Sequence, residues 1–143
     1  MFNFWKTIKV LSCAYPFFVG MDILWIGFIM NSYYKEKIGS MVRMSNGAMS
    51  PNLPSSLLVW FLIVLGSYIF VLPRITELPI IGKFIWGGLY GLILYGVYDL
   101  TNYAILTAWP FSITLVDLGW GIFANGILAV ALSFLYKYFD GTN

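Results

Sequence analysis

Three aspartates lie inside long apolar runs of this 143-residue sequence. Asp99 stands in the stretch Tyr-Gly-Val-Tyr-Asp-Leu-Thr-Asn, and Asp22 and Asp117 occupy two other runs. A carboxylate in hydrocarbon costs roughly 2.5 to 3.5 kcal/mol on insertion scales, so such residues normally face a partner or a water-filled cavity. We therefore expect the three side chains to point inward and to converge on one buried acidic pocket.

Polar and aromatic residues accompany the aspartates at helical spacing, where residues three and four apart share a face. These further candidate ligand-binding residues are Tyr95, Tyr98, Asn102, Thr114, Trp25 and Trp120. The two tryptophans and the two tyrosines among them could form an aromatic box around a cation. We favour the other interpretation, in which most aromatic side chains face lipid or the membrane interface.

The charges around the aspartates leave two interpretations open. No Lys or Arg lies at their depth, so three ionised carboxylates would repel one another unless some carry a proton or a cation is present. Alternatively, each carboxyl group bonds to a Tyr, Thr, Asn or Trp side chain and only holds the helices together. We favour a functional site, because intramembrane acids are usually functional.

The residue types that are missing exclude several kinds of chemistry. The sequence has no histidine and a single cysteine, Cys13. An intrachain disulfide, zinc or haem ligation by imidazole, and Ser-His or Cys-His catalysis are therefore excluded. We expect no cofactor and no catalytic residues, and the residues leave open whether a metal ion binds the carboxylates.

The composition is that of a protein embedded in a lipid bilayer. Hydrophobic residues make up 60% of the chain and charged residues 10%, whereas a soluble domain has about 25% charged residues. Long continuous apolar runs favour helices over a barrel, whose strands alternate in polarity. All eight basic residues lie in tails, loops or helix ends, which is typical of contact with lipid headgroups and is no evidence for nucleic acid.

The apolar runs predict an all-α membrane protein with four transmembrane helices in a bundle and one integral membrane domain, 1–143. We expect helices at about 10–30, 55–72, 82–106 and 113–136. The first run is long for a signal peptide, so we interpret it as a retained helix. Within the polar connection 31–54, the spacing of Tyr34 and Ile38 is that of a short interfacial helix, with a disordered loop as the alternative.

Four spans place both chain ends on one side of the membrane. The basic residues on that side would be Lys6, Lys9, Arg74, Lys83 and Lys137, and those on the other side Lys35, Lys37 and Arg43. This excess favours cytoplasmic termini. At 1.5 Å rise per residue, the three aspartates would then lie roughly 6 to 12 Å below the same, non-cytoplasmic surface.

Two shared patterns bear on packing. Asp22-x-x-Trp25 and Asp117-x-x-Trp120 have the same form, and because one lies on an odd span and the other on an even span, any internal duplication would be inverted. Gly87 and Gly91 form a G-x-x-x-G pair that lets another helix approach closely. We take that face as a candidate seam for a homo-oligomer.

The strongest patterns together resemble a known family. They are the stretch from Tyr95 to Asn102, the Trp109-Pro110 turn, and Thr114-Leu-Val-Asp-Leu-Gly-Trp-Gly. Asp22-x-x-Trp25-x-Gly27 and the segment from Tyr34 to Gly39 fit the same pattern, so the resemblance covers nearly the whole chain. The family is catalogued as domain of unknown function 2177 and consists of predicted bacterial membrane proteins. The resemblance implies a four-helix protein of the bacterial inner (plasma) membrane, with no assigned catalytic residues.

Three functions are compatible with these observations. We favour a small transporter or channel-like subunit that binds a cation, a proton or a cationic solute at the acidic pocket. The second is a membrane enzyme that acts on a lipid or isoprenoid, against which stands the lack of an Asp-rich metal motif or an activated nucleophile. The third is an accessory subunit of a membrane complex.

Overall fold

The computed structural model describes residues 3–141, and helices form nearly all of this range. The elements in chain order are α1 (Phe4–Asp22), η1 (Ile23–Ile29), α2 (Asn31–Ile38), β1 (Met44–Ser45), β2 (Ala48–Met49), α3 (Leu53–Gly66), η2 (Ser67–Val71), α4 (Leu72–Ile75), α5 (Ile80–Ile105) and α6 (Phe111–Tyr138). The two segments η1 and η2 are π-helical turns that continue α1 and α3.

Four helical segments are long and apolar enough to cross a membrane, which confirms the all-α fold class. They are Phe4–Ile29, Leu53–Ile75, Ile80–Ile105 and Phe111–Tyr138. Each covers the range expected from the apolar runs to within a few residues at the ends. The first begins earlier than expected because the Asn3 side chain accepts a hydrogen bond from the Lys6 backbone N–H and caps the helix.

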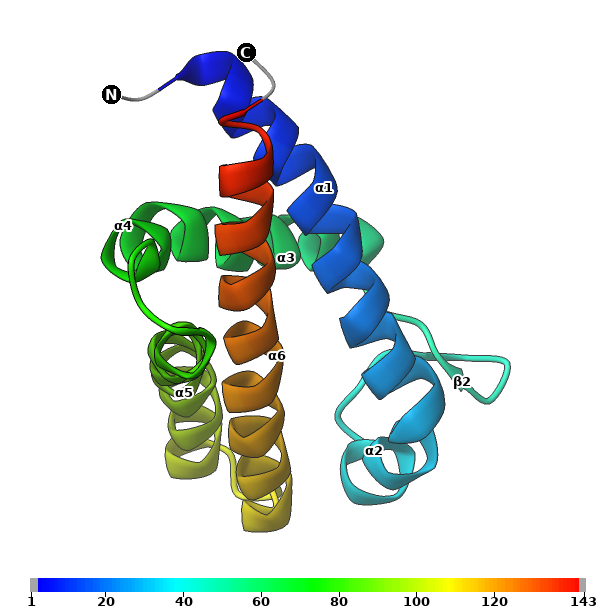
Figure 1. The fold of residues 1–143 in the computed structure, drawn as a ribbon. Helices are drawn as coiled ribbons and strands as arrows, with labels where there is room; N and C mark the ends of the chain where they lie inside the picture. The colour runs from blue at the N-terminus through cyan, green and yellow to red at the C-terminus, as the bar shows by residue number, and fades with distance from the viewer. Residues whose placement is uncertain (1–2, 142–143) are drawn as a thin grey trace.

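Helix α6 lies between α1 and α5, while α3 and α4 run across its direction in the view of Figure 1. The second apolar segment therefore does not lie alongside the others as in a simple up-and-down bundle. It is joined to α1 by two hydrogen bonds between side chains. Trp60 of α3 donates to Asp22, and the hydroxyl groups of Tyr68 in η2 and Thr7 in α1 lie 2.8 Å apart.

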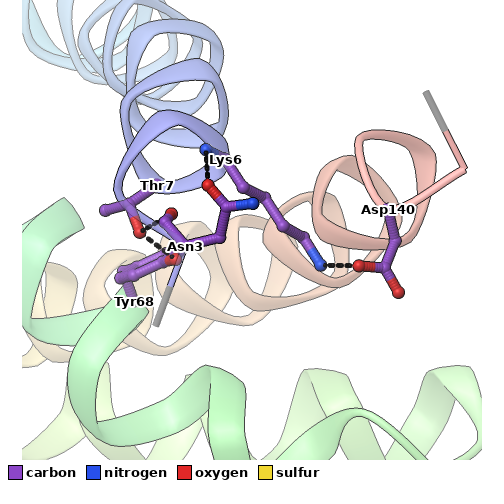
Figure 2. Close-up of polar contacts among 5 residues, drawn as sticks. All are labelled: Asn3, Lys6, Thr7, Tyr68 and Asp140. Carbon is purple, nitrogen blue, oxygen red and sulfur yellow. Dashed lines mark hydrogen bonds and ion pairs between the residues drawn. The ribbon is translucent and has the colours of Figure 1, made fainter. Parts of the chain in front are cut away.

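The two ends of the described chain meet at the same end of the molecule (Figures 1 and 2). Lys6 Nζ forms an ion pair with the carboxylate of Asp140 at 2.5 Å and also lies over the ring of Tyr136. Figure 2 shows this pair beside the Thr7–Tyr68 contact. Which side of the membrane this end faces stays a prediction.

The first loop contains a helix and a hairpin. The predicted short helix is present as α2, and it buries Tyr34 and Ile38 against Ile113 of α6. Strands β1 and β2 pair antiparallel, with Asn46 and Gly47 at positive φ of 49° and 76°. Asn-Gly is the pair that such a two-residue hairpin turn favours.

Helices α5 and α6 pack through two facing rows of residues spaced four apart, which we call the α5–α6 seam. The rows are Lys83, Gly87, Gly91, Tyr95 and Asp99 on α5, and Ser133, Ala129, Asn125, Gly121 and Asp117 on α6. A Cβ atom at Gly87 would collide with Asn125 and Ala129, and one at Gly91 would collide with Gly121. Small residues spaced four apart let membrane helices approach closely, and here they bring the α5 and α6 backbones together.

The seam occupies the glycine face that sequence reasoning assigned to a second copy of the chain. Gly87 and Gly91 pack against α6 of the same chain, so a homo-oligomer through this face would require α6 to move. Association of copies of this chain stays a prediction.

Helix α1 presents a similar row to the core. Lys6, Val10, Ala14, Phe18 and Asp22 are spaced four apart and all are buried. As in the α5 row, a lysine stands at the first position and an aspartate at the last, sixteen residues later. Both flanking helices therefore place a buried acid at the end of the molecule opposite the termini.

Candidate functional site

Asp22, the last residue of α1, joins three helices through its carboxylate. Trp60 of α3 donates its indole N–H to Oδ2 at 2.6 Å, and Trp120 of α6 donates to Oδ1 at 2.7 Å. Only 4% of the Asp22 surface is exposed. Because indole nitrogens only donate, both oxygens act as acceptors and the carboxylate has a donor for each.

The two Asp-x-x-Trp motifs meet at this point. The rings of Trp25 and Trp120 stack with centroids 4.5 Å apart and planes within 1° of each other. Trp25 lies in η1, which begins directly after Asp22. π-Helical turns often occur at functional sites, and here the π-helical turn brings Trp25 of the first motif against Trp120 of the second.

Asp117 of α6 accepts a hydrogen bond from Tyr34 of α2. Burial, followed by the negative charge of Asp117 and this hydrogen bond, raises the pKa of the Tyr34 hydroxyl well above its usual range. Tyr34 therefore remains a donor at any physiological pH. Through this bond and the packing of Ile38 with Ile113, α2 is held against α6.

Asp99 is the aspartate without a donor. Its side chain is 0% exposed, and no N–H or O–H group of the described residues donates to either oxygen. The carboxyl group that interacts with it is that of Asp117, which stands opposite it at the end of the α5–α6 seam. Two carboxylates are both acceptors, so this contact becomes a hydrogen bond only when one of them carries a proton.

Tyr95 lies among the three acids. It interacts electrostatically with Asp22, Asp99 and Asp117, and Asp117 in turn interacts with the other two. Its ring packs on Gly121, where a Cβ would come within 2.6 Å of the ring. The structure thus brings together Asp22, Asp99, Asp117, Tyr34, Tyr95, Trp25, Trp60 and Trp120, a set that we call the acidic cluster.

Three of the candidate residues lie outside the acidic cluster. Tyr98 is 61% exposed on the outer face of α5, with its ring edge toward Trp109. Thr114 is buried, and its hydroxyl accepts the Trp109 indole N–H at 3.1 Å. Asn102 is half-buried, and its backbone carbonyl accepts from Leu106 at the end of α5. An aromatic box that includes Tyr98 is therefore not formed.

The chain matches a family model described as Predicted membrane protein (DUF2177) over residues 7–134. It belongs to this family. No curated protein and no solved structure matches the chain. The matched range contains every residue of the acidic cluster, and membership in DUF2177 confirms an integral membrane protein.

Two of the three acids of this DUF2177 protein are closed off from the surface, whereas Asp117 is partly exposed. Asp22 and Asp99 are almost fully buried, and the three aspartates line neither of two grooves on the described surface. Both grooves are apolar: one lies along Leu92, Gly96 and Leu100 of α5, and the other beside Trp25, Trp120 and Phe123. Asp22 is buried beneath the tryptophans that donate to it, and Tyr34 of α2 contacts Asp117.

Sequence reasoning missed two members of the acidic cluster, Trp60 and Tyr34, as site residues. Trp60 lies in an apolar run with no ionisable residue, a pattern that indicates only a structural role. An indole N–H far from the helix ends nevertheless needs an acceptor inside the protein, and that requirement could have identified it. The spacing of Tyr34 indicates a helix at the membrane interface, and its position beside Asp117 depends on α2 folding back onto α6.

Proposed function

We propose that this DUF2177 protein is a small transporter or channel-like subunit that binds a cation, a proton or a cationic solute at the acidic cluster. The observation that carries the proposal is Asp99. A fully buried carboxyl group with no donor, beside a second carboxyl group, lacks the compensation that buried charges require. A positively charged occupant would supply it.

The distribution of basic residues supports this proposal. The buried lysines of the flanking helices, Lys6 and Lys83, stand sixteen residues before Asp22 and Asp99, about 24 Å along the helix axis. Neither can neutralise the aspartates at that distance. Among the described residues, the donors to the cluster's carboxyl groups are neutral indole and phenol groups.

The burial of Asp22 and Asp99 supports an occluded state in a transport cycle. At the acidic end, Tyr34 of α2 donates to the partly exposed Asp117, and at the other end the Lys6–Asp140 pair joins α1 to the chain after α6. We take these two contacts as the closures of which one would have to open to release an occupant. We further propose cytoplasmic termini in the bacterial plasma membrane, and association of copies, since four helices rarely enclose a pathway alone.

Flux through proteoliposomes tests the proposed function. Purified protein is reconstituted and assayed for protons with a trapped pH dye, and for Na⁺, K⁺ and tetraethylammonium with labelled ions. We expect flux of at least one of these, reduced to the level of empty liposomes by Asp99→Asn and Asp117→Asn. Glu77→Gln, which alters an exposed acid in the turn before α5, should leave the flux unchanged.

Two outcomes would overturn the proposal. One is flux of all four probes equal to that of empty liposomes, with protein that is folded by circular dichroism. The other is flux that Asp99→Asn and Asp117→Asn leave at the wild-type level, because the acids would then not lie on the path.

A further inference from the structure

The register of the α5–α6 seam sets Asp99 against Asp117. At one end of the seam, Lys83 Nζ donates to Ser133 Oγ at 2.6 Å. Each following pair is reached by stepping four residues forward on α5 and four back on α6, and close contacts at Gly87–Ala129, Gly91–Asn125 and Tyr95–Gly121 follow this register. The final step gives Asp99 and Asp117. The packing of the two helix backbones therefore places Asp99 and Asp117 opposite each other.

The donors available to the three aspartates divide them into two kinds. Both oxygens of Asp22 accept from indole N–H groups, which cannot accept a proton in return. Asp117 accepts from Tyr34 at one oxygen. Both oxygens of Asp99 are without a donor among the described residues.

We propose that Asp99 and Asp117 share one proton and that Asp22 stays ionised as a fixed negative charge beside them. The proton lies between an oxygen of Asp99 and the Asp117 oxygen that does not accept from Tyr34. This inference deepens the proposed function, on which it rests, by naming the proton as the cation of the site. The pair then carries one negative charge, and loading and release exchange one proton at one pair of oxygens.

The ligands on hand favour a proton over a metal ion. Calcium and magnesium take at least six oxygen ligands, and three carboxylate oxygens are free here: two of Asp99 and one of Asp117. The described residues contain no group of three or more Asp, Glu or Cys side chains placed to hold a metal. A proton needs two oxygens and no cavity, which agrees with the closed surroundings of Asp99.

The groups that face the pair would not replace its proton. Tyr95 comes from α5 itself, Asp22 from α1 and Tyr34 from α2. Tyr34 and Tyr95 are neutral phenols, and Asp22 adds negative charge, which favours retention of the proton by the pair.

Infrared spectroscopy of the protein in lipid nanodiscs tests the shared proton. A protonated carboxyl group has a C=O band distinct from that of a carboxylate, and we expect one such band at neutral pH that shifts in D₂O. Asp99→Asn and Asp117→Asn should each remove it, because the new amide N–H donates to the remaining carboxylate in place of the proton. Asp22→Asn should retain the band. Trp60→Phe should also retain the band. This variant keeps Asp22 and replaces Asp22→Asn in the test if Asp22→Asn does not fold.

Three results would overturn the inference: no protonated-carboxyl band at neutral pH, a band that persists in both Asp99→Asn and Asp117→Asn, or loss of the wild-type band when Na⁺, K⁺ or Mg²⁺ is added at constant pH. The proposed function fails independently. If the band and its variants behave as expected but no flux is found, the shared proton stands and transport is refuted. If Na⁺ flux is found without the band, transport stands and the shared proton is refuted.

Discussion

Lys83 of α5 donates a hydrogen bond to Ser133 of α6 at 2.6 Å, at the end of the seam opposite Asp99. Both residues are buried, with Lys83 7% exposed. Among the described residues, Ser133 is the one side chain that accepts from this ammonium group. Because the Lys83 ammonium group is buried and has this one side-chain acceptor, the stability of the seam depends on Ser133.

We predict that Ser133→Ala destabilises the protein by about 1 to 3 kcal/mol, because it leaves the Lys83 ammonium buried without an acceptor. Lys83→Met should instead be neutral or stabilising, since it removes the buried charge and keeps a similar volume. Thermal unfolding in detergent measures both. Greater destabilisation by Lys83→Met than by Ser133→Ala would show that the lysine is stabilised by more than the serine.

The seam also predicts opposite effects for two glycines of the same helix. Gly91→Ala should destabilise by about 1 to 3 kcal/mol, because its methyl group would meet the Gly121 backbone and force the helices apart. Gly96→Ala has nothing within 4 Å of the new atom and should gain up to about 1 kcal/mol from helix propensity. Unfolding temperatures of the two variants compare them directly. Equal shifts would contradict the close packing at Gly91.

Sequence patterns predicted the helices and the acids but not their partners. Runs of apolar residues determine where membrane helices form, so all four were found, and Asp22 and Asp99 were correctly expected to be buried. Lys83 shows the limit. It stands near a helix start, where a lysine normally reaches water, and its burial is decided by the fit of α5 against Ser133 across the seam.

The burial of Asp22 shows the same limit. Spacing places Trp25 near Asp22 and Trp120 near Asp117, yet whether the tryptophans line a hollow or fill it depends on the crossing of α3, which places Trp60 against Asp22. A uniformly apolar helix has no distinct polar and apolar faces from which this crossing could be predicted. Long-range packing, rather than local propensity, therefore determines how open the site is.

The hydrogen bond from Tyr34 to Asp117 predicts how α2 is held against α6. Tyr34→Phe removes the hydrogen bond to Asp117 while keeping the buried ring, so we expect faster amide hydrogen exchange in α2 and little change in α5 and α6. Tyr33→Phe, on the neighbouring residue, is the matched control and should leave exchange as in the wild type. Unchanged exchange in Tyr34→Phe would mean that apolar contacts such as Ile38 with Ile113 hold α2 alone.

The arrangement of basic residues predicts the direction of insertion. The end of the molecule that holds both termini carries Lys6 and Lys137, whereas Lys35, Lys37 and Arg43 belong to the first loop at the other end. The order of the four expected spans assigns Arg74, Lys83 and Lys9 to the same side, and this excess of positive charge favours that side for the cytoplasm. The hairpin should then face outward.

Single-cysteine labelling in spheroplasts tests this direction, because Cys13 is the one native cysteine and Cys13→Ser provides an unlabelled background. A membrane-impermeant maleimide should label Ser45→Cys, in the exposed hairpin, on intact spheroplasts. Gly141→Cys, beyond the end of α6, should react only after the membrane is permeabilised. The opposite pattern would place the acidic cluster near the cytoplasmic surface, so that α2 would close the site toward the cytoplasm and the Lys6–Asp140 pair would close it toward the outside.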